Sequence, residues 1–233
     1  MIQSFPTLDA WAEAAAARLA DALAEALASD GRALFAGSGG STPSPIYAQL
    51  AKADLDWTSV AATLVDERYV PETSPDSNAA LLKRALLTGP AAIARFIPLY
   101  SPAVTVDRAA ALASQALAAE SRPLDAVLLG MGEDGHICSM FPGSPTLTTL
   151  LTPGLKPAVY GVPAGRDGAA PLQERLTLNL PWLAGARCVV LALTGAKKRA
   201  VFEREATRDP AVSPIAALIA AKAPLEVFWT EAG

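Results

Sequence analysis

Residues 32–43 read RALFAGSGGSTP, and this stretch indicates the fold class. Its first five residues form an apolar run of strand length, and a Gly-rich turn follows without a break. We expect a helix next, over residues 44–52. A strand, a Gly-rich turn and a helix in this order are the building unit of an α/β sheet.

The Gly-rich turn has two readings. Backbone N–H groups in residues 37–42, together with the dipole of the next helix, form a cradle for a phosphate, and Ser41 and Thr42 add hydroxyl donors. The stretch is equally compatible with a tight strand-to-helix turn that binds nothing. It is not a Walker A loop, because the Gly-Lys-Ser/Thr ending is missing.

Apolar periodicity predicts an alternation of strands and helices along the chain. The apolar stripe of residues 7–29 predicts a helix that Asp30 and Gly31 end, and Asn78 is a candidate N-cap for another. Further helices are predicted over residues 79–87, 106–121, 197–205 and 213–221, strands over 58–65, 96–99, 125–129, 188–193 and 225–229, and extended segments over 158–162 and 175–178. This order predicts an α/β fold with one open, mostly parallel sheet, helices on both faces, and a single domain over residues 1–233.

Composition narrows the function classes. The chain has 233 residues, of which 52% are hydrophobic and 18% charged, enough to bury a large core. The formal net charge is -4 and no run of Lys or Arg forms a basic stripe, so we expect no nucleic-acid partner. Charged residues interrupt the apolar runs before they reach the length of a membrane span, and the first residues lack a basic region before an apolar core. We therefore expect a cytoplasmic protein without a membrane partner.

The cysteines and the histidine argue against a metal site. Cys138 and Cys188 are isolated, so we expect free thiols rather than a disulfide. The chain has only one histidine, and no Cys/His cluster has the spacing of metal ligands. We expect no zinc site and no other cofactor.

Four polar or Gly-rich segments follow predicted strands. They come after Ala36, Val65, Leu129 and Leu193. In open α/β sheets, ligands bind beyond the carboxyl ends of the strands. We therefore expect the four segments to converge on one site.

The only histidine, His136, ends the segment GMGEDGH at residues 130–136. The glycine spacing is that of a dinucleotide-binding loop, but Pro142 stops any helix soon afterwards and no ribose-binding acid follows, which disfavours a nicotinamide cofactor. A carboxylate two residues before an imidazole, here Asp134, can fix its tautomer and stabilise its charged form, as a general base requires. The alternatives are a structural histidine and an Asp134 that only caps the turn.

Two other strand ends carry candidate anion ligands. In the run Asp66-Glu67-Arg68, the planar guanidinium of Arg68 can grip a phosphate or carboxylate, although the run also fits a solvated strand end. Lys198, near a predicted helix start, is either a surface lysine or a phosphate ligand. Because no Gly-x-Ser-x-Gly elbow is present, attack by water that His136 activates is favoured over an acyl-enzyme.

Five short motifs stand in a fixed order along the chain. They are GGSTP at 39–43, DERYVP at 66–71 with SN at 77–78, GMGEDGH at 130–136 with FPG at 141–143, RLTL at 175–178 and GAKK at 195–198. Together, and over about residues 33–229, they resemble the 6-phosphogluconolactonase family. That family belongs to a larger group with glucosamine-6-phosphate deaminases and ribose-5-phosphate isomerases. The group shares an open α/β fold of the NagB/RpiA type, a modified Rossmann fold.

The resemblance implies a reaction and a site. The reaction is hydrolysis of 6-phospho-D-glucono-1,5-lactone to 6-phospho-D-gluconate, in the oxidative branch of the pentose phosphate pathway, with this small molecule as the partner and without a metal. His136 would be the general base and Asp134 its partner. The substrate and its phosphate would be bound by Gly39, Gly40, Ser41, Thr42, Asp66, Arg68, Arg175 and Lys198.

Two other functions stay open. A deaminase or aldose-phosphate isomerase would share the fold and the Gly-rich loop, but residues 140–143 read MFPG where the deaminases typically have Phe-Asn-Glu-Pro. A non-catalytic sugar-phosphate sensor would carry a DNA-binding or partner module, and we see none in the sequence. The chain also departs from the family pattern at residues 163–171, where a lysine is usual and Arg166 is its candidate substitute.

Overall fold

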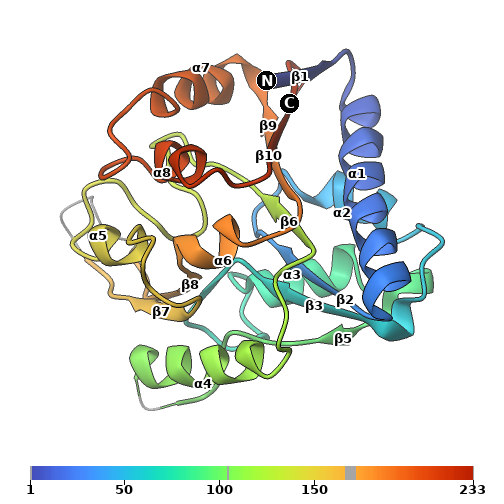
Figure 1. The fold of residues 1–233 in the computed structure, drawn as a ribbon, viewed down its shortest axis with the longest axis horizontal. Helices are drawn as coiled ribbons and strands as arrows, with labels where there is room; N and C mark the ends of the chain where they lie inside the picture. The colour runs from blue at the N-terminus through green and yellow to red at the C-terminus, as the bar shows by residue number, and fades with distance from the viewer. Residues whose placement is uncertain (1, 104, 166–171, 233) are drawn as a thin grey trace.

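The computed structural model describes residues 2–103, 105–165 and 172–232. Within them the main sheet has seven strands in the order β1-β10-β9-β6-β2-β3-β5, and every neighbouring pair is parallel (Figure 1). The strands are β1 (Ile2–Phe5), β2 (Ala33–Gly37), β3 (Val60–Leu64), β5 (Arg95–Phe96), β6 (Ala126–Leu129), β9 (Val189–Thr194) and β10 (Leu225–Thr230). This open parallel sheet confirms the predicted fold class.

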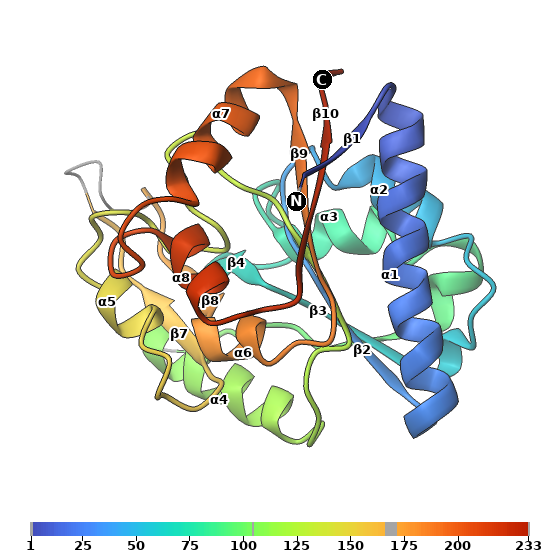
Figure 2. The same ribbon diagram turned by 45° about the horizontal axis from the view of Figure 1, so that its top comes forward.

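Helices cover both faces of the sheet. α1 (Leu8–Asp30) and α2 (Ser44–Leu50) lie on one side of β9 and β10, and α7 (Gly195–Glu205) and α8 (Pro214–Ala220) lie on the other (Figure 2). The other helical segments are α3 (Asn78–Ala85), α4 (Val106–Ala118), α5 (Leu147–Leu150), α6 (Leu180–Ala184) and the 3-10 turns η1 (Trp57–Ser59) and η2 (Gly89–Ile93). Because both sheet faces are covered, β2 and β3 are buried at every position and read as continuous apolar runs. No helix in the described part of the chain is both long enough and apolar enough to cross a membrane.

Local chemistry sets both ends of α1, close to the predicted bounds. Thr7 is the N-cap, and its side chain accepts a hydrogen bond from a backbone N–H of the first turn. Gly31 ends the helix with a φ of 69°, a left-handed conformation that favours glycine. The buried indole of Trp11 donates a hydrogen bond to the carbonyl oxygen of Phe228 at 3.0 Å, which ties α1 to β10.

A second, three-stranded antiparallel sheet stands beside the first. Its order is β4 (Asp66–Arg68), β8 (Arg175–Leu178) and β7 (Val159–Val162), and α4 packs against β7 and β8 (Figure 1). The sequence pattern indicated that β7 and β8 are extended, but it did not predict β4. Three charged residues after an apolar strand look like its solvated end, and only pairing with the distant β8 makes them a strand.

Other local predictions differ from the structure for identifiable reasons. Residues 2–5 form an edge strand, β1, which the sequence reading left without structure. The strand predicted over 96–99 stops early, because Pro98 has no N–H with which to continue the pairing. Ser77, not Asn78, caps α3, since the Ser77 Oγ accepts from the backbone of the first turn. The Asn78 side chain is therefore free to contact other groups.

Candidate active site

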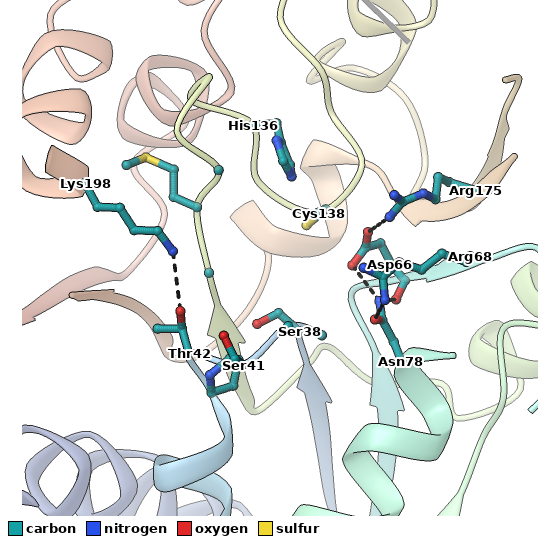
Figure 3. A pocket seen from close by; sticks show the side chains of 16 residues that line it. Ser38, Ser41, Thr42, Asp66, Arg68, Asn78, His136, Cys138, Arg175 and Lys198 are labelled. Atoms are coloured by element: carbon teal, nitrogen blue, oxygen red, sulfur yellow. Dashed lines mark hydrogen bonds and ion pairs between the residues drawn. The ribbon is translucent and has the colours of Figure 1, made fainter. Parts of the chain in front are cut away.

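One pocket lies at the carboxyl edge of the main sheet, beyond the ends of β2, β6 and β9 (Figure 3). Its volume is about 250 Å³. The lining residues are Ser38, Gly39, Gly40, Ser41, Thr42, Pro43, Asp66, Arg68, Asn78, Gly130, Met131, Gly132, His136, Cys138, Arg175 and Lys198. They include residues from all four segments that follow predicted strands, so the expected convergence is confirmed.

His136 lines this pocket and is held from behind by Asp134. The Nδ1 of His136 lies 2.6 Å from Oδ1 of Asp134, and the backbone N–H of His136 donates to the same oxygen at 3.2 Å. A carboxylate at Nδ1 selects the tautomer in which Nε2 carries a lone pair. Partial burial by itself would raise the pKa of the Asp134 carboxyl, but the hydrogen bond and the charge interaction with His136 lower it overall. Asp134 therefore has both of the roles that the sequence suggested. It caps the turn through the backbone N–H of His136, and it orients the imidazole ring through Nδ1.

Two glycines allow the loop to fold this tightly. A Cβ on Gly132 would overlap both Nδ1 of His136 and Oδ1 of Asp134. Gly135 has a φ of 89°, and a Cβ there would lie 2.7 Å from Cγ of the buried Glu205. The first position needs glycine because of close approach, and the second because of both backbone conformation and contact.

Lys198 and Thr42 form one wall of the pocket (Figure 3). Lys198 projects from the first turn of α7 toward the Gly-rich loop, and its Nζ lies 3.4 Å from Oγ1 of Thr42. Burial lowers the pKa of Lys198, although the charge of Glu133 opposes that shift. A half-buried ammonium beside hydroxyls and backbone N–H groups is a suitable environment for an anion.

Arg68 and Arg175 form the opposite wall, with Asp66 and Asn78 beside them (Figure 3). The Nη1 atom of Arg68 donates hydrogen bonds to Oδ1 of Asn78 at 2.6 Å and to the carbonyl oxygen of Asp76 at 2.8 Å. An Nη1 of Arg175 lies 3.8 Å from Oδ2 of Asp66, which is too long for a hydrogen bond. Burial lowers the pKa of the Arg175 guanidinium, and the charge of Asp66 opposes this effect.

The fully buried carboxylate of Glu67 supports the Arg68 wall. Its Oε1 accepts from the backbone N–H groups of Arg68 and Asn78 at 2.7 and 2.8 Å. Its Oε2 accepts from the Ser77 hydroxyl at 3.0 Å and the Ala79 N–H at 2.8 Å. Burial raises the pKa of Glu67 even though these four hydrogen bonds favour its charged form. Glu67 thus ties β4 to the start of α3 and fixes the backbone that carries the two pocket side chains.

Ser139 links the His136 loop to the second sheet. Its hydroxyl donates to Oδ2 of Asp66 at 2.6 Å, and its backbone N–H donates to Oγ1 of Thr177 at 3.1 Å. The preceding residue, Cys138, has a φ of 53°, a costly conformation for a residue with a Cβ, which the Ser139 hydrogen bonds help to hold. Burial raises the pKa of the Cys138 thiol well above its usual value, so it is not an ionised nucleophile. Both cysteines are free, as expected.

The structure brings the predicted site residues together. It places Gly39, Gly40, Ser41, Thr42, Asp66, Arg68, His136, Arg175 and Lys198 around the pocket, with Asp134 behind His136. The two candidate anion ligands, Arg68 and Lys198, stand on opposite walls (Figure 3). Arg166 lies outside the described residues.

Sequence analysis missed two polar groups of the site. Apart from its place in the SN motif, Asn78 was considered only as a helix cap, although Ser77 can cap the same helix and so leave the Asn78 side chain free. The role of Glu67 in holding the backbone of Arg68 and Asn78 was also not predicted, because Glu67 lies in a charged run that resembles a solvated strand end. Over residues 2–103, 105–165 and 172–232, no group of three or more His, Cys, Asp or Glu side chains is arranged to hold a metal ion.

Proteins of this construction form a class of α/β enzymes that bind phosphorylated small molecules at the carboxyl edge of a parallel sheet. Residues 6–229 match the family described as glucosamine-6-phosphate isomerases/6-phosphogluconolactonase. The chain belongs to this family.

Individual relatives agree with this assignment. A 6-phosphogluconolactonase of Mesorhizobium japonicum is 42% identical, over 97% of this chain and 93% of its own length. The crystal structure of a 6-phosphogluconolactonase from Shewanella baltica superposes with a TM-score of 0.89 at 33% identity, covering 99% of this chain and 97% of that one. A monomeric glucosamine-6-phosphate deaminase, at 17% identity and a TM-score of 0.76, covers 98% of this chain and 96% of its own and shares the fold.

Proposed function

We propose that this chain hydrolyses 6-phospho-D-glucono-1,5-lactone to 6-phospho-D-gluconate, the lactone-opening step of the oxidative pentose phosphate pathway. The observation that carries the proposal is the His136–Asp134 pair at a pocket that Lys198, Arg68 and Arg175 also line (Figure 3). The names of the full-length relatives support the same reaction. A base beside an anion-binding pocket is what hydrolysis of a phosphorylated lactone requires.

In this mechanism His136 is the general base. Its Nε2 takes a proton from water as the water oxygen bonds to C1 of the lactone. The bond between C1 and the ring oxygen then breaks, and the same imidazole returns the proton to that oxygen. Asp134 keeps the ring oriented and stabilises the imidazolium between the two transfers.

We further propose an orientation for the substrate. The phosphate lies against Lys198, Thr42 and the Gly-rich loop, because an ammonium, a hydroxyl and backbone N–H groups come together on that wall (Figure 3). The opposite wall holds the carboxylate of Asp66, which repels a phosphate dianion but accepts hydrogen bonds from sugar hydroxyls. Arg68 and Arg175 therefore bind the sugar-acid part of the molecule in this proposal, rather than its phosphate.

The reaction is tested with freshly made 6-phosphogluconolactone beside unphosphorylated gluconolactone, with chelator present and spontaneous hydrolysis subtracted. We expect fast turnover of the phosphorylated lactone. His136→Ala should fold normally and lose about 10²–10⁴-fold in kcat, the usual contribution of a general base. Near-normal turnover by a folded His136→Ala protein would remove this residue from the mechanism, and no turnover by the unmodified chain would contradict the proposed reaction.

The orientation is tested by comparing the same two lactones in three variants. Lys198→Met should raise KM for the phosphorylated lactone about 10- to 100-fold, the value of a hydrogen bond to a charged group, and leave gluconolactone unaffected. Lys197→Met is the matched control, because Lys197 is exposed and its ammonium pairs with Glu133 instead. Arg68→Ala should weaken the use of both lactones equally. A loss confined to the phosphorylated lactone in Arg68→Ala would place the phosphate on the Arg68 wall.

Two further expectations belong to this proposal. A single-domain organisation over residues 1–233 is supported by the continuous hydrophobic core and by the family match over residues 6–229. Location in the cytoplasm, without a nucleic-acid or membrane partner, is supported by the metabolic role of the relatives and by the low, negative net charge. Fluorescence microscopy of a tagged chain tests the location.

A further inference from the structure

Phe141 contacts two groups of the pocket that come from different parts of the chain. Its ring centroid lies 4.6 Å from that of the His136 imidazole, with the planes inclined by 37°. The guanidinium carbon of Arg175, on β8, lies 6.0 Å from the same ring. Phe141 is half-buried and packs against the hydrophobic core, so its own position is well supported. The motif that contains it, FPG at residues 141–143, has no role in the mechanism described so far.

His136 needs a second contact to keep its orientation. The hydrogen bond from Nδ1 to Asp134 holds one edge of the ring, but a ring held at one atom can still pivot about that bond. The Asp134 side chain is itself 54% exposed, and that of His136 is 30% exposed. An aromatic face beside the imidazole limits the pivot and keeps Nε2 directed at the pocket.

Arg175 has few polar contacts to hold it. Its Nε has no hydrogen-bond partner among the residues that the structure describes, and its distance to Asp66 exceeds that of a hydrogen bond. The face of Phe141 is therefore one of the main restraints on the guanidinium, through a contact between a cation and an aromatic ring.

We propose that Phe141 is a positioning residue that fixes the base His136 and the sugar-binding cation Arg175 relative to each other. This inference rests on the proposed function, in which His136 is the base. Phe141 does not touch the substrate in this proposal. It sets the angle of the imidazole from one side and the place of the guanidinium from the other, so that the attacked carbon and the sugar hydroxyls are presented together.

The test compares Phe141→Leu with Phe141→Tyr, on the full chain with 6-phosphogluconolactone. For the Leu variant we expect kcat to fall about three- to tenfold and KM to rise by a similar factor. The Tyr variant keeps the ring and should restore both kcat and KM. Phe96→Leu is the matched control, since Phe96 on β5 also lies under a cation, Lys83 at 4.7 Å, but stands outside the pocket. It should leave both values unchanged.

The outcomes separate this inference from the proposed function. An unchanged kcat in a folded Phe141→Leu protein, with His136→Ala inactive, would overturn the positioning role and keep the reaction. An unchanged KM alone would overturn the part that concerns Arg175. An equal loss in Phe141→Leu and Phe141→Tyr would also overturn the inference, because the ring would then not be what matters. Full activity in His136→Ala would instead overturn the mechanism on which the inference rests.

Discussion

Replacing Gly132 by alanine tests whether the His136–Asp134 geometry matters for the reaction. The added Cβ would fall on the hydrogen bond itself, overlapping both Nδ1 of His136 and Oδ1 of Asp134. Gly132 does not have a left-handed φ, so the substitution does not strain the backbone directly. The methyl group therefore acts by displacing both partners of the pair.

The structure sets the size of the expected effect. To reach ordinary van der Waals contact with the new methyl, the imidazole and the carboxylate must each move by about 1 Å. A displacement of this size at a reacting group costs about 10²-fold in rate, or about 2.7 kcal/mol of transition-state stabilisation. The loss cannot much exceed about 10⁴-fold, the upper contribution of a general base. Because the Lys198 wall stands across the pocket, affinity for the product should stay within about threefold, or less than 0.7 kcal/mol.

Three quantities are measured on the same samples. They are kcat with the phosphorylated lactone, the affinity for the product by calorimetry, and the unfolding temperature. Gly154→Ala is the matched control, since a Cβ there meets nothing within 4 Å and the residue is remote from the pocket. Its kcat should equal that of the unmodified chain. If Gly132→Ala is folded and keeps kcat within about threefold, less than 0.7 kcal/mol, the contact between Asp134 and His136 is not needed for turnover.

Two further predictions concern the opposite walls. Glu67→Gln replaces one acceptor oxygen by an N–H donor that faces two other donors, so it should lower the free energy of unfolding by about 2–4 kcal/mol at neutral pH. Chemical denaturation measures this, and the exposed Glu72→Gln should change stability by less than about 1 kcal/mol, or the argument from burial is wrong. Because burial lowers the pKa of Lys198, its ammonium loses the proton at a lower pH than a free lysine does, and a bound phosphate favours the protonated form. Calorimetry should therefore show weaker binding of 6-phosphogluconate as pH rises toward 10.5, the usual pKa of a lysine side chain, and Lys198→Arg should lack this alkaline loss; the same loss in both proteins would assign it to another group.

Much of the fold follows from short-range patterns. The first helix, the strand at 33–37 and the turn after it are set by apolar periodicity, by Thr7 and Gly31, and by the local need for glycine. The rule that ligands bind at the carboxyl ends of parallel strands then brings the pocket together from segments far apart in the chain. These arguments need no knowledge of side-chain packing.

The features that were not predicted depend on which segments, distant in the sequence, lie side by side in the fold. β4 is a strand only because β8 pairs with it, and its own three charged residues give no sign of that. The order of strand ends along the sheet does not say which cation faces which, so the sequence could not predict that Arg68 and Lys198 stand on opposite walls of the pocket. The contact of Phe141 with Arg175, which places its ring between that guanidinium and His136, is likewise a tertiary contact without a local signal.

The pocket is assembled from positions that lie very far apart along the chain. Thr42 meets Lys198, and Asp66 meets Ser139, across sequence separations of 156 and 73. Contacts of such long range form late and slowly during folding, because closing large loops costs entropy before the contacts can stabilise them. The first and last thirds of the polypeptide must therefore come into contact before the active site is complete. The recovery of turnover after dilution from denaturant therefore measures the rate of complete folding. The circular-dichroism signal of the helices reports only the early stages of folding.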